Sequence, residues 1–197
     1  DFVNLRSVLI GDRQPSFRDL HHNQIPWLNA SQNAAVAKVL NARETAIVHG
    51  PPGTGKTTTL VEAISETLKR ETQVLVCAPS NAAVDWISKQ LFRRGISVLR
   101  IGNPLRINDV MMQCSYEYRY GNHPDYLELF SIRSSLREIK SRPKLGEKEH
   151  NQIRKLQHRE MELEVKIREE LFATSGVIAC TLIGSANHLM ERHHFGT

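Results

Sequence analysis

The sequence predicts an α/β fold in which helices flank a parallel β-sheet and a helical hairpin is inserted between two strands. The first observation is that short apolar runs alternate with stretches of helical period, an order typical of a parallel sheet covered on both faces. The second is a long polar segment, 105–173, that separates the last two apolar runs and carries leucines and isoleucines at steps of three and four residues. The third is a glycine-rich run, 50–57, between an apolar run and a helical stretch.

Four apolar runs are predicted to form the strands. The run 73–78 is apolar almost throughout, as expected of a strand that is buried on both faces. Shorter runs complete the predicted sheet at 46–49, 97–101 and 177–180. Helices are predicted around these strands at 29–40, 57–69 and 85–94.

The segment 105–173 is predicted to contain two antiparallel helices. Apolar residues recur with helical spacing over 129–139 and again over 153–171, and turn-forming residues at 142–146 separate the two stretches. Residues 131–172 hold 11 Lys or Arg and 8 Asp or Glu, so the charges are mixed. The mixture favours a solvated face, and a basic track for nucleic acid is the alternative.

The run 50–57 reads Gly-Pro-Pro-Gly-Thr-Gly-Lys-Thr and fits the phosphate-loop pattern G-x-x-x-x-G-K-[ST]. Glycines allow the backbone to turn its N–H groups inward as a cradle for an anion, and the helix that follows adds its positive N-terminal end. We therefore predict a nucleoside triphosphate site, with Lys56 reaching the β- and γ-phosphates and the Thr57 hydroxyl ligating Mg²⁺. The residues expected to line it are Gly50, Pro51, Pro52, Gly53, Thr54, Gly55, Lys56, Thr57 and Thr58. The alternative is a glycine-rich turn that only joins strand to helix.

Gln32 lies eighteen residues before Gly50 and near the start of the predicted helix 29–40. One interpretation is a capping box, in which Asn29 is the N-cap and Gln32 reaches back to it. The other is adenine recognition, because a glutamine amide accepts a hydrogen bond from adenine N6 and donates one to N7. One residue can serve both roles in different nucleotide states.

The segment Ala-Pro-Ser-Asn at 78–81 follows the predicted strand 73–78. Ser80 and Asn81 are suited to capping the next helix. The other interpretation is contact with a nucleic-acid backbone, because small hydroxyl and amide groups hold phosphates without reading the base sequence.

The formal net charge of +5 and the pI of about 9.3 are compatible with a nucleic-acid partner without identifying one. Three widely spaced cysteines indicate a reducing compartment, so we expect a cytoplasmic protein, or a nuclear one in a eukaryote. No apolar stretch approaches the ~20 residues of a membrane span, and no membrane association is expected. The sequence begins without methionine and ends beside an apolar stretch, which suggests a piece of a longer protein.

Five motifs in order, at 29–32, 50–57, 76–85, 99–102 and 177–181, resemble those of superfamily 1B helicases. The resemblance covers 28–197. It is strongest to the branch that contains the nonsense-mediated-decay RNA helicase and the immunoglobulin-mu-binding-protein helicase.

The resemblance implies a RecA-like P-loop domain that uses ATP and Mg²⁺ in an ATP-dependent helicase, moving 5′ to 3′ on single-stranded RNA or DNA. It implies that Gln32 contacts adenine, and that Ser80, Asn81 and Thr181 touch the single strand. RNA and DNA remain equal alternatives, because the choice depends on 2′-hydroxyl contacts.

By the same resemblance the chain divides into a lead-in segment of uncertain role at 1–27, a RecA-like domain at 28–104 and 174–197, and an inserted helical accessory subdomain at 105–173. An Asp-Glu motif and a second RecA-like domain are expected after Thr197. Since no carboxylate directly follows the predicted strands, we expect the chain alone not to hydrolyse ATP. Two other functions stay open, a P-loop small-molecule kinase with the insert as its lid, and a nucleotide-gated protein-interaction module.

Overall fold

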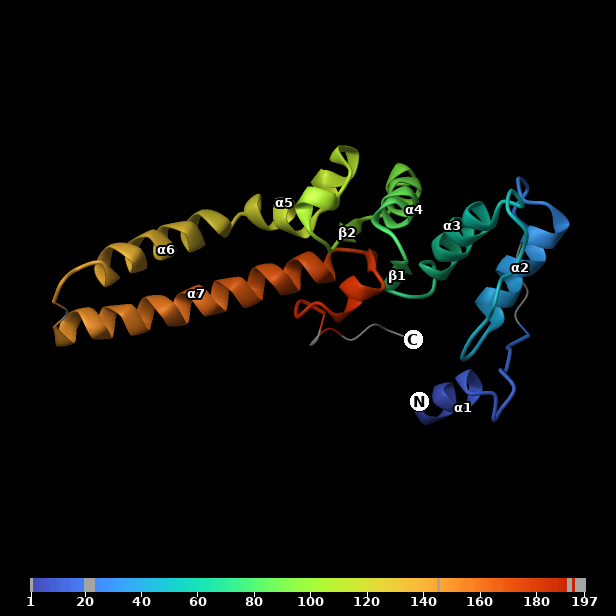
Figure 1. Ribbon diagram of the computed structural model, residues 1–197, viewed down its shortest axis with the longest axis horizontal. Coiled ribbons are helices and arrows are strands. Elements are labelled where there is room, and N and C mark those ends of the chain that lie inside the picture. The colour runs from blue at the N-terminus through green and yellow to red at the C-terminus, as the bar shows by residue number, and fades with distance from the viewer. Residues whose placement is uncertain (1, 20–23, 145, 191–192, 194–197) are drawn as a thin grey trace. The chain divides into compact units, whose positions relative to one another are not determined.

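The computed structural model describes residues 2–19, 24–144, 146–190 and 193, so the end of the predicted segment 174–197 lies largely outside the described residues. The chain forms two compact units, one within Asp1–Val74 and one within Leu75–Phe195. Figure 1 labels helices α1 to α7 and strands β1 and β2. Each unit has its own buried apolar cluster. The α/β class with an inserted helical hairpin is confirmed.

Among its described residues the first unit contains three helices, α1 Phe2–Leu9, α2 Ala30–Asn41 and α3 Lys56–Thr67. Helices α2 and α3 pack together around a small cluster made by Ile25, Leu28, Val36 and Ala63. The predicted helices at 29–40 and 57–69 correspond to α2 and α3, each within about two residues at either end. The local signals that begin and end a helix were therefore sufficient here.

Residues 16–18 of the lead-in segment are tied to the end of α2. Phe17 and Ala42 form an isolated antiparallel bridge, and the Arg18 N–H donates to the Asn41 carbonyl oxygen at 2.6 Å. The carboxylate of Glu44 accepts from the Ser16 N–H at 2.7 Å and from its hydroxyl at 2.8 Å. The Ser16 N–H in particular holds the pKa of Glu44 below its ordinary value. The lead-in segment is thus fastened to this unit by short polar contacts.

The strand predicted at 46–49 is wrong. Residues 45–51 have no regular secondary structure, and Ile47 is 83% exposed. A strand exists only where a neighbour pairs its N–H and C=O groups, and none of the three strands of the described sheet pairs with 46–49. The apolar composition of the run indicated burial, but it carried no information about a pairing partner.

The second unit is built on a three-stranded sheet in the order β1-β3-β2, formed by β1 Val74–Ala78, β2 Val98–Arg100 and β3 Val177–Thr181. Strands β2 and β3 are parallel, with Val98 opposite Val177. The Leu182 N–H donates to the Ala78 carbonyl oxygen at 3.1 Å, so β1 and β3 end at the same edge of the sheet. Helix α4, Asn81–Arg93, packs against β2 and β3. It begins four residues before the predicted 85–94, because Ser80 is its N-cap.

The elements described between β2 and β3 are helices and 3₁₀ turns, with one isolated parallel bridge between Arg100 and Ser115. Two 3₁₀ turns and a short helix come first, and the two long helices of the hairpin follow: η1 Pro104–Arg106, η2 Asp109–Cys114, α5 Tyr116–Gly121, α6 Tyr126–Lys140 and α7 Glu147–Ala173. After β3 comes a further 3₁₀ turn, η3 Ile183–Ala186. Helices α6 and α7 contact each other along the hairpin. No helix among the described residues combines the length and the apolar character that a membrane crossing requires.

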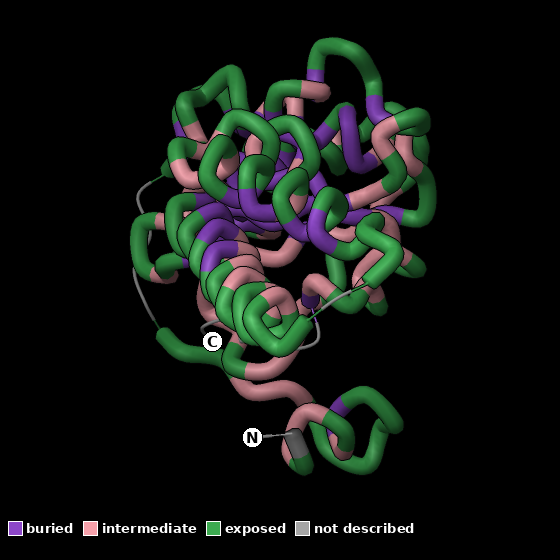
Figure 2. The backbone as a smooth tube through the Cα atoms, turned by 90° about the vertical axis from the view of Figure 1, so that its left-hand side faces the viewer, coloured by how far each residue is buried: buried purple, intermediate pink, exposed green. Residues whose placement is uncertain are grey.

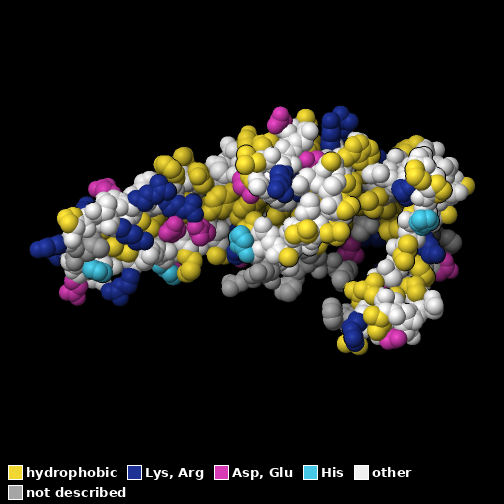
Figure 3. Space-filling view, viewed as in Figure 1, with side chains coloured by type: hydrophobic (Ala, Val, Ile, Leu, Met, Phe, Trp, Pro, Cys, Tyr) yellow, Lys and Arg dark blue, Asp and Glu magenta, His cyan; other side chains and the backbone are white. Residues whose placement is uncertain are grey.

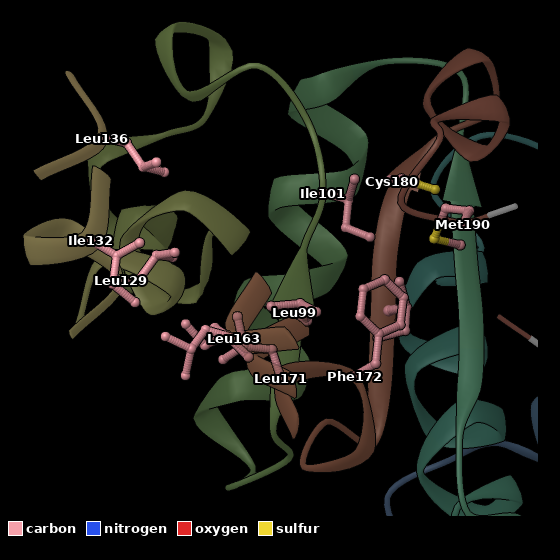
Figure 4. Packing of buried hydrophobic residues seen from close by; sticks show 12 residues of the cluster. Leu99, Ile101, Leu129, Ile132, Leu136, Leu163, Leu171, Phe172, Cys180 and Met190 are labelled. Carbon is pink, nitrogen blue, oxygen red and sulfur yellow. The ribbon is translucent and has the colours of Figure 1, made fainter. Parts of the chain in front are cut away.

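One apolar cluster joins the hairpin to the sheet. Figure 4 shows Leu99 of β2 beside Leu163 and Leu171 of α7. The buried members are Leu99, Ile101, Leu129, Ile132, Leu136, Leu163, Ile167, Leu171, Phe172, Ile178, Cys180 and Met190. Figure 2, which views the chain from the hairpin side, shows exposed helix turns in front and buried ones behind them. The base of the hairpin therefore shares its core with the sheet.

The hairpin surface carries paired charges. Arg133 contacts Glu160 at 3.1 Å and also Glu164. Arg159 contacts Glu128 at 2.8 Å, and Lys166 contacts Asp125 at 2.6 Å. Figure 3 shows Lys and Arg side chains interspersed with Asp and Glu along this part of the molecule. Part of the mixed charge seen in the composition is thus arranged as ion pairs across the hairpin, each of small energetic weight because it is at least partly exposed.

Candidate functional site

The phosphate loop has the backbone geometry that its glycines predict. Gly53 and Gly55 have φ angles of +83° and +79°, in the left-handed region that favours glycine. Gly55 is the N-cap of α3, so Lys56, Thr57 and Thr58 form its first turn. Their N–H groups make no hydrogen bond to other described residues. A row of free N–H groups at a helix N-terminus fits a phosphate group.

The Lys56 side chain folds back over this loop. Its ammonium group donates to the carbonyl oxygens of Gly50 at 2.7 Å and Pro51 at 2.8 Å. The Thr54 hydroxyl donates to the same Pro51 oxygen at 2.8 Å and closes the turn through Pro52. Lys56 is exposed and contacts neutral carbonyls instead of a carboxylate, so its charge is available to an anion. The loop therefore fits a polyphosphate.

The Thr57 hydroxyl is the one group of the loop predicted to bind a metal. Thr57 is exposed in the first turn of α3, and its hydroxyl has no protein partner among the described residues. A free hydroxyl oxygen next to a phosphate cradle suits Mg²⁺, which takes oxygen ligands and shares them with phosphates. The residues present are thus compatible with the predicted metal, and this role stays a prediction.

Gln32 is placed against the phosphate loop by a capping box. The Gln32 side-chain oxygen accepts from the Asn29 N–H at 3.0 Å, and the Asn29 side chain accepts from the Gln32 N–H at 2.9 Å. The Gln32 amide NH₂ also donates to the Thr54 carbonyl oxygen at 3.3 Å. A methyl group added to Gly55 would lie 2.5 Å from this nitrogen, so a larger residue there would displace the Gln32 amide from its present position. The capping role is confirmed, and adenine recognition stays a prediction.

Three residues predicted to touch nucleic acid lie at one edge of the sheet in the second unit. Ser80 follows β1, is exposed, and accepts from the Ala83 N–H at 3.2 Å. Thr181 is the last residue of β3, and its hydroxyl accepts from the Gly184 N–H at 3.0 Å. Asn81 is half-buried beside Ser80. Since β1 and β3 end at the same edge, the structure brings all three together, while their contact with a strand stays a prediction.

Arg100 is a residue at this edge that the sequence interpretation did not single out. It is completely buried, and its guanidinium group donates to Asp85 at 2.8 Å and to the Asn81 side-chain oxygen at 2.8 Å. The second oxygen of Asp85 accepts from the Asn108 N–H at 2.9 Å. The available signal was a single arginine within the apolar run 97–101, because a charge in a buried strand needs a partner.

Two sites with carboxylates were candidates for Mg²⁺, Asp85 beside the sheet and a cluster on the hairpin, and neither is suited to the ion. Asp85 is engaged by Arg100 and by the Asn108 N–H. His123, Asp125 and Glu170 on the hairpin have ligand atoms within 4.8 Å of one another. There, however, the Lys166 ammonium lies 2.6 Å from Asp125 and 3.8 Å from Glu170, where a cation would bind. Neither of these two sites therefore offers Mg²⁺ a free carboxylate.

The fold and the loop together define a P-loop nucleotide-binding domain of the α/β class. Residues 27–164 match the model of a protein family described as "AAA domain". The chain belongs to this family, and within it to the superfamily 1B helicases of the nonsense-mediated-decay and immunoglobulin-mu-binding-protein branch.

Three relatives illustrate the similarity. The chain is 34% identical to the DNA polymerase alpha-associated DNA helicase A of Schizosaccharomyces pombe, over 98% of this chain and 29% of that protein. It is 33% identical to the DNA-binding protein SMUBP-2 of Rattus norvegicus, over 93% of this chain and 19% of that protein. It is 30% identical to the ATP-dependent helicase upf1 of S. pombe, over 93% of this chain and 20% of that protein.

The alignments cover nearly all of this chain but only part of each relative. The chain spans less than a third of the length of each of these curated relatives. Coverage of 98% of this chain means that the similarity extends into 1–27, beyond the range on which the motifs were recognised. The lead-in segment is therefore shared with a relative.

Proposed function

We propose that this chain is the ATP-binding part of an ATP-dependent superfamily 1 helicase that moves 5′ to 3′ along single-stranded RNA or DNA. The observation that carries the proposal is the phosphate loop, whose free N–H groups and Lys56 ammonium converge at the N-terminus of α3. The words "helicase" and "ATP-dependent" in the names of relatives support the same activity for the full-length protein.

In this proposal the residues of the loop hold the triphosphate. Gly50, Pro51, Pro52, Gly53, Thr54, Gly55 and Thr58 line it with backbone groups, and Lys56 binds the β- and γ-phosphates. Thr57 supplies an oxygen ligand to Mg²⁺, which when bound neutralises phosphate charge. Gln32 contacts adenine through its amide, for which it must exchange its hydrogen bond to Thr54.

The strand is held at the sheet edge by Ser80, Asn81 and Thr181 through its phosphates. A second RecA-like domain of the full-length protein is proposed to contact the nucleotide from the other side and to complete the site. This chain alone is proposed to bind ATP without hydrolysing it, because Asp85 is engaged by Arg100. The cytoplasm, or the nucleus of a eukaryote, is the proposed compartment, which the three free cysteines support.

The test is ATP binding by the chain and by two lysine variants, measured by titration calorimetry with MgATP. Lys56→Ala should weaken binding at least tenfold, because an ammonium–phosphate hydrogen bond is lost. Lys148→Ala, at an exposed position in the first turn of α7, is the matched control and should bind like the wild type. Equal affinities for all three proteins would contradict the assignment of the loop.

A second measurement separates a helicase from a small-molecule kinase. ATP turnover by the full-length protein should rise when a single-stranded oligonucleotide is added, and a kinase should not respond. Comparing RNA and DNA oligonucleotides of one sequence would also identify the preferred strand.

A further inference from the structure

We propose that Arg100 is a positioning residue that fixes the Asn81 amide with its NH₂ group facing outward, so that Asn81 binds a phosphate of the strand and not a base. The inference rests on the proposed function, since it concerns how the predicted nucleic-acid edge works. It adds a buried residue to that edge and a reason why the contact is independent of base sequence.

The orientation of the Asn81 amide follows from chemistry. The terminal guanidinium nitrogen of Arg100 lies 2.8 Å from one end of the Asn81 amide. Arginine has five N–H donors and no acceptor, so only the amide oxygen can face it at this distance. The amide NH₂ must therefore point the other way. No other described residue accepts a hydrogen bond from it.

Arg100 is itself held rigidly. It is 0% exposed, and its Nε donates to Asp85 at 2.8 Å while another guanidinium nitrogen donates to the Ile101 carbonyl oxygen. Asp85 is fixed in turn by the Asn108 N–H at 2.9 Å. A methyl group on Gly102 would lie 2.9 Å from the guanidinium, so glycine leaves the space that the arginine needs. With every partner in place, little side-chain freedom remains to be lost when Asn81 binds.

The outward NH₂ group has the chemistry for a phosphate. It offers donors and no acceptor, which matches the acceptor-only phosphate oxygens of a nucleic-acid backbone. A base edge that presents both donors and acceptors would need both ends of the amide. Such a readout places the base edge against the oxygen and the NH₂ group together, and the buried Arg100 guanidinium already lies at the oxygen. Asn81 therefore contributes affinity for a strand without preference for its bases.

The test uses fluorescence anisotropy of labelled dT, dA and dC 12-mers with the wild-type chain and with Asn81→Ala, Asn81→Asp and Arg100→Met. Asn81→Ala should weaken binding of all three oligonucleotides by the same factor, about tenfold. Asn81→Asp keeps an oxygen for Arg100 and removes the outward donor. It should therefore fold like the wild type, by circular dichroism, and bind at least as weakly as Asn81→Ala. Arg100→Met should weaken binding as Asn81→Ala does, and the double variant should be no weaker than either single one.

The outcomes separate the inference from the proposed function. A wild-type chain that binds no oligonucleotide would contradict the proposed function itself. A wild-type chain that binds, together with an Asn81→Asp variant of unchanged affinity or losses that differ among the three bases, would overturn the role of Asn81. Additive losses in the double variant would overturn the role of Arg100. If Arg100→Met does not fold, Arg100→Lys takes its place, because lysine keeps the buried charge beside Asp85 and lacks the second guanidinium nitrogen that donates to Asn81. A folded Arg100→Lys variant with unchanged affinity would then overturn the role of Arg100.

Discussion

Replacing Ile167 by alanine should destabilise the second unit by about 3 kcal/mol. Ile167 lies in α7, is 0% exposed, and belongs to the cluster that joins the hairpin to the sheet. The substitution removes three carbon atoms. Burial of each methylene-sized group contributes about 0.8 kcal/mol to stability, so the loss of three such groups costs roughly 2.4 kcal/mol. The remaining cavity adds to this cost because neighbouring side chains from strands and helices cannot all move into it.

The assay is urea unfolding of the chain followed by circular dichroism at 222 nm, with a control on the same helix. Met161 is 57% exposed, and methionine and alanine are both good helix formers. Met161→Ala should therefore change the free energy of unfolding by no more than about 0.5 kcal/mol. The chain has two compact units, and Ile167 lies in the second. The unfolding transition whose urea midpoint shifts in Ile167→Ala is therefore that of the second unit.

The reasoning would be refuted by a loss below about 1 kcal/mol in Ile167→Ala, or by equal losses in both variants. Either result would mean that α7 does not share a tightly packed core with the sheet. A large loss confined to Ile167→Ala would instead show that the hairpin cannot be removed without exposing the strands beneath it.

The remaining predictions concern titration, reactivity and base selectivity. Lys166 and Arg159, by hydrogen bonding, hold the pKa of Asp125 and of Glu128 below their ordinary values of 3.8 and 4.5. The stability from these pairs is thus complete above about pH 5 and lost as the pH falls below 4, so the thermal midpoint should drop between pH 5 and 3. Burial raises the pKa of the Cys180 thiol to about 12, so iodoacetamide at pH 8 should leave Cys180 unmodified in the native chain and alkylate it in urea, by mass spectrometry. Gln32→Ala should reduce the preference for ATP over GTP in calorimetric titrations, more than it weakens binding of inorganic triphosphate.

Local patterns predicted most of the elements. Helix α2, its N-cap Asn29 and the capping box with Gln32 all follow from residues within one turn of each other. The hairpin followed from apolar residues at helical spacing, and those predicted in α6 are buried. The phosphate loop is also a contiguous segment, and its glycines took the predicted left-handed conformation. Where the determinant of a structure lies within a few residues, the sequence is sufficient.

Features that depend on distant residues were missed. The run 46–49 is as apolar as a strand, but pairing requires a partner that composition does not reveal. The Arg100 network depends on β2 lying beside α4, fifteen to nineteen residues away in the chain. The arginine within the run 97–101 was visible, and only the packed structure identifies Asp85 as the carboxylate that compensates its charge.

The two proposed binding sites differ in the same respect, because one is built from neighbouring residues and the other from residues far apart in the sequence. The nucleotide residues are consecutive except for Gln32, and their donors are the backbone N–H groups of one helix turn and the Lys56 ammonium beside them. The proposed strand-binding edge is formed by Ser80, Asn81 and Thr181 from the ends of two strands, and Arg100 donates to one of them. Substitutions that shift the sheet should therefore weaken strand binding more than they weaken triphosphate binding. The proposed edge thus depends on side-chain identity and tertiary packing together.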